Sequence, residues 1–123
     1  MLEIGDVFIV QVGSQIEHRD TKHVICVATS NNKYIIINTE HREMYDDFSI
    51  SATDYAFLHG HDRFVACSRI FQFSPDCIIK KVGKLNYSDM MKLINKIQNS
   101  DVLDNKEKAS VLPELTDWQL DNC

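Results

Sequence analysis

The sequence predicts a mainly β domain in which five or six antiparallel strands form a small barrel closed by a C-terminal α-helix (α+β by content). The first two thirds of the chain consist of short runs rich in β-branched and aromatic residues, one of them clearly alternating with period two. After Gly83 the apolar residues recur with the period of an amphipathic helix. Because closure removes free strand edges, this order of elements favours a small barrel with a covering helix.

The strands are expected where apolar runs stand between polar turns. The five runs that predict strands are residues 6–12, 23–30, 33–40, 62–73 and 75–85. The second and third runs are joined by the polar residues 30–33, in which asparagine tolerates a left-handed backbone, so they are expected to form an antiparallel hairpin. The stretch 41–58 is polar and irregular, which predicts a long loop containing one or two short strands.

Two helices are expected in the last third of the chain. The first covers residues 86–100, with Asn86 or Ser88 as its N-cap. A shorter helix is expected over residues 105–112, begun by Asp104 as the cap and ended by Pro113.

At 123 residues the chain has the length of one domain. Residues 1–100 are expected to form the barrel with its closing helix, and residues 101–123 a short helix and an acidic tail. The tail is either loosely ordered or held by packing of Trp118 and Leu120 on the domain.

Composition limits the classes of function. Thirteen basic against eighteen acidic residues give a net charge of −5, which opposes a broad nucleic-acid-coating surface but allows a local basic patch. No apolar run is long enough to span a bilayer, and the N-terminus lacks the basic flank of a secretion signal. We therefore expect a cytoplasmic protein without a membrane partner. Cys26 and Cys67 lie in strand-like runs without C-x-x-C spacing, which predicts reduced, buried thiols.

Three polar stretches hold most of the candidate functional residues: residues 17–23, 38–43 and 59–63. Each has an ordinary interpretation, as a solvated loop, a charged strand exit or a polar hairpin closure. Every histidine lies between residues 18 and 61, at the end of an expected strand. Because strand ends gather at the rims of a barrel, the three stretches are also expected to converge on one groove, where histidine can transfer a proton and arginine can hold a phosphate.

The residues 59–63, His-Gly-His-Asp-Arg, also have a metal-binding interpretation. A His-x-His pair on a strand places both rings on one face, and Asp62 could join them. A metal site needs three or four ligands, however, and the other histidines lack ligand spacing. Gly60 indicates a turn rather than a regular strand. We therefore expect no metal and no cofactor.

Several stretches, taken in order along the chain, resemble the toxins of the MazF/PemK family. The similar stretches are residues 4–13, 21–30, 34–40, 64–73 and 80–97, which correspond to the opening strand, the second and third strands, the final strand, and the corner with the last helix. The resemblance implies an SH3-like barrel with a C-terminal helix. It further implies metal-independent, sequence-selective cleavage of single-stranded RNA by a homodimer, products that end in a cyclic phosphate, and a cognate antitoxin that blocks the groove.

The match to the family's residues is partial. Lys22 stands where the family has the arginine of an Arg-Pro pair, His23 stands at the proline, and Thr39 matches the threonine that ends the third strand. The family's final strand often carries Arg-Cys-Asp, whereas here Ala66 replaces the arginine and Ser68 the aspartate. Either the charge has moved to neighbouring arginines and histidines, or cleavage is lost.

In the catalytic interpretation, Arg19 neutralises the phosphate, one of His18, His59 or His61 is the general base, and a hydroxyl group positions it. The candidate catalytic residues are His18, Arg19, Thr39, His59, His61 and Ser68. The candidate substrate-binding residues are Lys22, His23, His41, Arg42, Arg63 and Arg69.

The alternative is a non-catalytic binding module on the same barrel, which would use its groove for a protein partner in a mobile-element or phage-defence operon. The replaced arginine and aspartate and the net charge of −5 favour this alternative. The concentration of histidine and arginine favours the enzyme.

Overall fold

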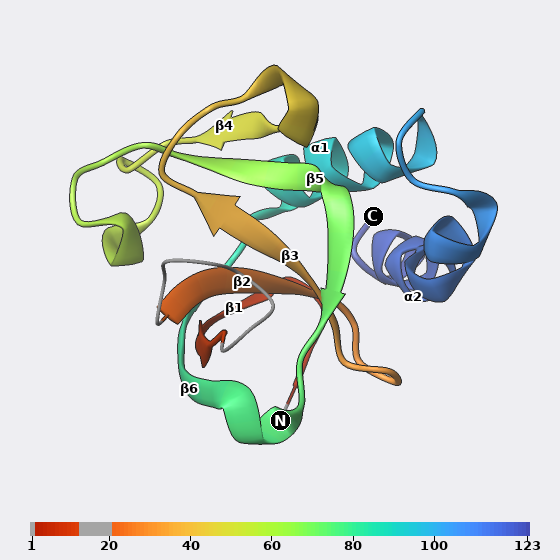
Figure 1. The fold of residues 1–123 in the computed structure, drawn as a ribbon, viewed down its shortest axis with the longest axis horizontal. Helices are drawn as coiled ribbons and strands as arrows, with labels where there is room; N and C mark the ends of the chain where they lie inside the picture. Colours follow the sequence, from red (N-terminus) through yellow and green to blue (C-terminus); the bar gives the residue numbers. More distant parts are fainter. Residues whose placement is uncertain (1, 13–20) are drawn as a thin grey trace.

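A computed structural model describes residues 2–12 and 21–123. Six strands form one antiparallel sheet in the order β4-β5-β3-β2-β1-β6, and two helices follow them in the chain (Figure 1). The strands are β1 (Asp6–Gln11), β2 (Thr21–Ala28), β3 (Lys33–Asn38), β4 (Phe48–Ile50), β5 (Arg63–Gln72) and β6 (Ile78–Lys84). The predicted fold class, antiparallel β with C-terminal helix, is confirmed. Neither described helix is long and apolar enough to cross a membrane.

The sheet is not closed, which distinguishes it from the barrel expected from the sequence. In the described part of the chain β4 pairs only with β5, and β6 pairs only with β1, so these two strands form the edges. The long strand β5 bends in its middle (Figure 1), where its register against β3 shifts between Tyr34 and Ile36. Its first half thereby lies between β3 and β4.

The loop of residues 51–62, which joins β4 to β5 and contains the 3₁₀ turn η3 (Ala56–Leu58), reaches the opposite edge of the sheet. The hydroxyl of Tyr55 donates to the carboxylate of Asp89 and accepts from the backbone N–H of Asn86 at 3.0 Å. The ring of Phe57 lies against the backbone of Gly83 in β6. Side chains of this loop thus connect the two edges that hydrogen bonding leaves apart.

Strands β2 and β3 are buried on both faces, which explains why their sequences are almost continuously apolar. Ile25 and Ile35 belong to the helix-side core, whereas Cys26 and Ile36 face a second core. The helix-side core includes Val7, Ile25, Ile35, Ile37, Val65, Cys67, Met90, Leu93, Ile94, Ile97, Val111 and Leu115. The second core consists of Phe8, Val10, Val12, Val24, Cys26, Tyr34, Ile36 and Phe73.

The two cysteines predicted to be buried are confirmed as buried, unpaired thiols. Cys26 lies in the second core and Cys67 in the helix-side core. Burial raises the pKa of each thiol to about 12, because the charged thiolate is poorly solvated in an apolar interior. Neither thiol is therefore a nucleophile at neutral pH.

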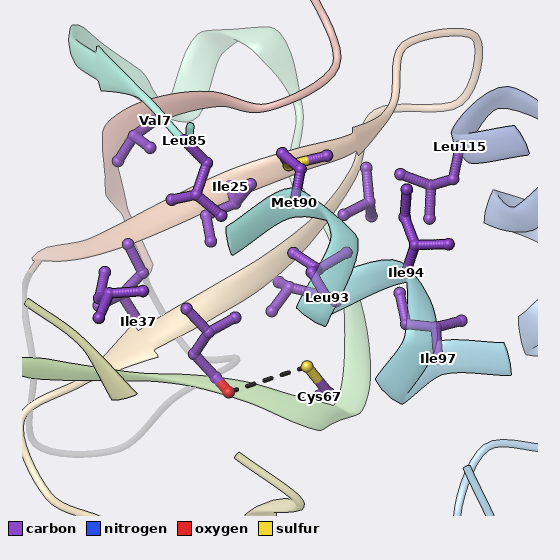
Figure 2. Packing of buried hydrophobic residues seen from close by; sticks show 14 of the residues in the cluster. Val7, Ile25, Ile37, Cys67, Leu85, Met90, Leu93, Ile94, Ile97 and Leu115 are labelled. Atoms are coloured by element: carbon purple, nitrogen blue, oxygen red, sulfur yellow. Dashed lines mark hydrogen bonds between the residues drawn. The ribbon is translucent and has the colours of Figure 1, made fainter. Parts of the chain in front are cut away.

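Helix α1 (Tyr87–Gln98) covers the helix-side core. Its N-cap is Asn86, whose side chain accepts a hydrogen bond from the backbone N–H of Asp89 at 2.8 Å. Figure 2 shows the apolar face of α1, including Met90, Leu93 and Ile97, packed on residues from the strands. The amphipathic pattern therefore predicted this helix.

Helix α2 (Asn105–Asp121) begins at the predicted cap, Asp104, which forms a capping box with Glu107. The prediction that Pro113 ends this helix is wrong, because the helix continues to Asp121. Val111 and Leu115 are fully buried on either side of the exposed proline. Their packing offsets the roughly 3 kcal/mol that proline costs inside a helix.

The end of the chain is consequently helical rather than a loose tail. Trp118 packs against the helix-side core and stacks on Tyr87 of α1, with ring centroids 5.8 Å apart. Leu120, the other residue expected to hold this segment, is 69% exposed.

The carboxylate of Glu114 connects α2 to the turn between β2 and β3 by hydrogen bonds. It accepts hydrogen bonds from the backbone N–H of Thr29 at 2.8 Å and of Ser30 at 3.0 Å, and from both hydroxyl groups. The predicted β2–β3 hairpin is confirmed, with Asn32 in the left-handed region at φ 53°.

Candidate functional site

A small pocket lies where the start of β2, the end of β3 and the start of β5 meet. The register places His23 opposite Ile37 and Ile37 opposite Val65, so these strand ends are side by side. The 51–62 loop covers them. This pocket, which we call the basic pocket, encloses about 130 Å³ and is lined by Thr21, Lys22, His23, Ile37, Thr39, Phe57, Leu58, His59 and Arg63.

Five of the residues predicted to be functional therefore lie together: Lys22, His23, Thr39, His59 and Arg63. They come from all three polar stretches expected to converge, although the first stretch contributes only its last residues. His18 and Arg19, in the rest of that first stretch, lie outside the described residues.

The described lining of the pocket contains cationic and titratable basic groups but no carboxylate. Lys22 donates to the side-chain oxygen of Asn38 at 3.2 Å, while Arg63 and the two histidines bring further positive or protonatable groups. The protein thus concentrates basic side chains locally despite a net charge of −5. Such a pocket attracts anions, and the planar fork of arginine suits a phosphate group.

His23 is a half-buried basic group of the pocket. Its imidazole stacks on Phe57, with ring centroids 5.9 Å apart and an interplanar angle of 21°. Burial lowers the pKa of His23 below its ordinary value of 6.5, and the charges of Arg63 and His59 lower it further. At neutral pH the ring is therefore uncharged and can accept a proton.

His59 stands at the end of η3 in a conformation that few residues adopt. Its φ is +52°, and the following Gly60 has φ +83°; the backbone N–H of His59 donates to Ala56 at 3.1 Å. A left-handed backbone at a residue other than glycine is uncommon and is held by its surroundings. The stretch 59–63 therefore begins as a turn, as Gly60 indicated.

Three side chains from the same stretches do not line the pocket in the described structure. His41 bonds to Asp47 through Nδ1, and its ring lies 5.7 Å from that of Phe64. Arg42 pairs with Glu40 at 3.5 Å and lies over Tyr45. The exposed His61 follows Gly60 and donates its backbone N–H to Leu58.

Ser68 and Arg69 lie in the second half of β5, beyond the residues that line the pocket. The guanidinium of Arg69 sits 4.5 Å from the ring centroid of Phe71. Ala66 is buried opposite Ile36, so this position supplies no charge to the pocket.

Within the described residues, no three side chains of the types that bind metals are gathered in a metal-binding arrangement. The sequence interpretation overlooked Thr21, Ile37, Phe57 and Leu58, which also line the pocket. Phe57 could have been suspected from the sequence as an aromatic residue two positions before His59, but no local pattern indicated that its ring lies against His23.

No protein-family model matches the sequence, and no curated protein matches it significantly.

Proposed function

We propose that the protein is a toxin of toxin–antitoxin type that binds single-stranded RNA in the basic pocket and cleaves it without a metal. The observation that carries this proposal is the meeting of two imidazoles and one guanidinium in a small pocket whose described lining has no carboxylate. These are the three functions that RNA transesterification requires: a base, an acid and a cation beside the phosphorus.

In the proposed reaction, neutral His23 takes the proton of the 2′-hydroxyl. The oxygen attacks phosphorus and forms a 2′,3′-cyclic phosphate, while protonated His59 gives its proton to the departing 5′-oxygen. Arg63 offsets the negative charge that develops on the phosphate oxygens, and the hydroxyl of Thr39 hydrogen-bonds one of them. Exchange of protons with water restores both imidazoles.

The resemblance to MazF/PemK toxins supports this location of the site at two residues that line the pocket: Thr39, which matches the family's threonine, and Lys22, which stands where the family has an arginine. In this proposal the active species is a cytoplasmic homodimer, and a cognate antitoxin inhibits it by covering the basic pocket. No cofactor takes part in the reaction.

The first test is cleavage of a labelled single-stranded RNA by the purified protein in the presence of a chelator. We expect a cyclic-phosphate product, a rate about 100-fold lower for Arg63→Ala, and an unchanged rate for Lys106→Ala, which removes the same charge from an exposed site on α2. An Arg63→Ala protein that cleaves as fast as wild type would remove the pocket from the mechanism.

The pH dependence tests the role of His23. Because the neutral imidazole is the base and its pKa is lowered, the rate should rise with pH along a limb whose midpoint lies below 6.5. Because the general acid must carry a proton, a falling limb should follow at higher pH. In His23→Gln this rising limb should disappear along with most of the activity. A limb that persists in that variant contradicts the assignment of His23 as the base.

A second candidate is an RNA-binding or protein-binding module without catalysis. Ala66 is buried and uncharged, so the charge that the toxin family carries at this position is absent. Induced expression separates the candidates: a catalyst arrests growth and fragments cellular RNA, whereas a binding module leaves RNA intact. Intact RNA, combined with Arg63-dependent binding of an oligonucleotide or a partner protein, supports the module.

A further inference from the structure

Phe57 occupies a position between two elements that are far apart in the sequence. One side of its ring stacks on His23 of β2, with a centroid separation of 5.9 Å. Elsewhere the ring approaches Gly83 of β6, and it also contacts the ring of Tyr55 at 5.4 Å. Phe57 is therefore packed between a strand edge and the imidazole that lines the basic pocket.

Gly83 makes this packing possible because it has no side chain. A Cβ atom at Gly83 would lie 2.8 Å from Cδ2 of Phe57, closer than such atoms approach in folded proteins, and 3.0 Å from Cε2. The backbone of Gly83 does not have a positive φ, so an alanine would fit its conformation. Among the described residues, the atoms nearest to such a side chain all belong to the Phe57 ring.

We propose that Phe57, seated on the bare backbone of Gly83, is a positioning residue that fixes the ring of His23 in the basic pocket and shields it from water. The consequence of this positioning for catalysis rests on the proposed function. A methyl group at Gly83 would push the ring of Phe57 off the strand and disturb its stack with His23.

The anchoring of the 51–62 loop supports this role. Tyr55, two residues before Phe57, bonds to Asp89 and Asn86 at the start of α1, and the loop returns to β5 at Arg63. The loop is thus held on both sides of Phe57. Within the described part of the chain, the charged or titratable groups that act on His23 are Arg63 from β5 and His59 from the loop.

The test is an NMR titration of His23 in wild type, Gly83→Ala and Phe57→Leu, with the resonance assigned by comparison with His23→Gln. Wild type should titrate below 6.5, because burial is the largest influence on His23. Loss of the shielding ring in either variant should shift the midpoint upward, toward 6.5. Phe57→Leu keeps the measurement possible if Gly83→Ala does not fold.

The matched control is Gly5→Ala. This substitution introduces a methyl group at a strained glycine, with φ +89°, where it meets the sulfur of Met90 at 3.4 Å rather than Phe57. It should lower stability without moving the midpoint of His23. An equal shift in Gly5→Ala and Gly83→Ala would show general loosening and overturn the proposal, as would an unchanged midpoint in folded Gly83→Ala and Phe57→Leu.

RNA cleavage by the same proteins separates this inference from the proposed function. If wild type cleaves RNA, Gly83→Ala should have a lower kcat, a rising pH limb displaced toward higher pH, and little change in KM. If wild type cleaves no RNA, the proposed function fails, and the titration of His23 still decides whether Phe57 positions and shields it.

Discussion

At the scale of single residues, Glu114 shows how one carboxylate joins distant parts of the chain. Burial acts to raise its pKa, but the hydrogen bonds from Ser30 and Thr29 outweigh burial and lower the pKa of Glu114 to about 2, from an ordinary value of 4.5. Because the pKa in the folded protein is below that of the unfolded chain, the stabilisation is complete above about pH 4.5 and is lost as the pH falls toward 2.

We therefore expect Glu114→Gln to lower the free energy of unfolding at pH 7 by about 1–2 kcal/mol, a value reduced by the partial exposure of the carboxylate. The difference from wild type should shrink as the pH falls below 4.5. Urea denaturation at a series of pH values measures it. Asp117→Asn, an exposed carboxylate on the same helix, is the control, and an equal loss in that variant would argue against the hydrogen bonds.

At the scale of elements, α2 illustrates a local rule overridden by tertiary packing. Proline has no N–H to donate to the carbonyl four residues earlier, here that of Ala109, and normally ends or kinks a helix. Yet Val111 and Leu115 are buried on both sides of Pro113, and Glu114 holds the adjoining turn. The helix is kept by contacts that a pattern read along the chain does not reveal.

Pro113→Ala should accordingly stabilise the protein, by about 1–3 kcal/mol, because it restores the missing donor at an exposed position. Thermal unfolding measures the gain, and Thr116→Ala, at another exposed position of α2, gives the ordinary effect of a better helix former. A destabilised Pro113→Ala protein would indicate that the proline itself is needed for α2 to contact the turn between β2 and β3.

At the scale of the whole molecule, the helix-side core and the second core share the strands β2 and β3. Successive residues of a strand point to opposite faces, so the six residues of β3 contribute side chains to both cores. If β3 leaves the sheet, both cores lose side chains that they need. Unfolding is therefore expected to be a single cooperative transition.

Ile35→Val and Ile36→Val test this cooperativity, one in each core. Each should lower the free energy of unfolding by about 1 kcal/mol, whereas Ile79→Val, on a side chain that is 54% exposed, should have little effect. Fluorescence of Trp118, the single tryptophan, and far-UV circular dichroism should give the same midpoint in each variant. Separate midpoints for Ile36→Val would mean that the two cores unfold independently.

Much of this architecture could be predicted from the sequence because its signals are local. Alternating or apolar runs indicated five of the strands, and the stretch 41–58 was expected to hold the short strand that proved to be β4. The open order of the sheet was not predicted, because it depends on the bend in β5 and on which strands pair at a distance. The continuation of α2 beyond Pro113 was also not predicted, because it depends on the packing of α2 against distant parts of the chain.

The site was predictable to the extent that strand ends meet. Thr39 and His59 lie together because β3 and β5 are neighbours and the 51–62 loop covers them. His41 and Arg42 lie outside the pocket because Asp47 and Glu40, close to them in sequence, engage their side chains. The seat of Phe57 on Gly83 joins residues 26 positions apart and has no counterpart in any local pattern.

The 51–62 loop both connects the open edges of the sheet and forms one wall of the basic pocket. The stability of the fold and ligand binding in the pocket therefore depend on the same segment. An anion bound between Arg63 of β5 and His59 of the loop would link these two segments. By mass action, saturation of such a site one hundredfold above its dissociation constant adds about 2.7 kcal/mol to stability. Heat resistance can thus report occupancy in a screen of nucleotides, without any assay of turnover.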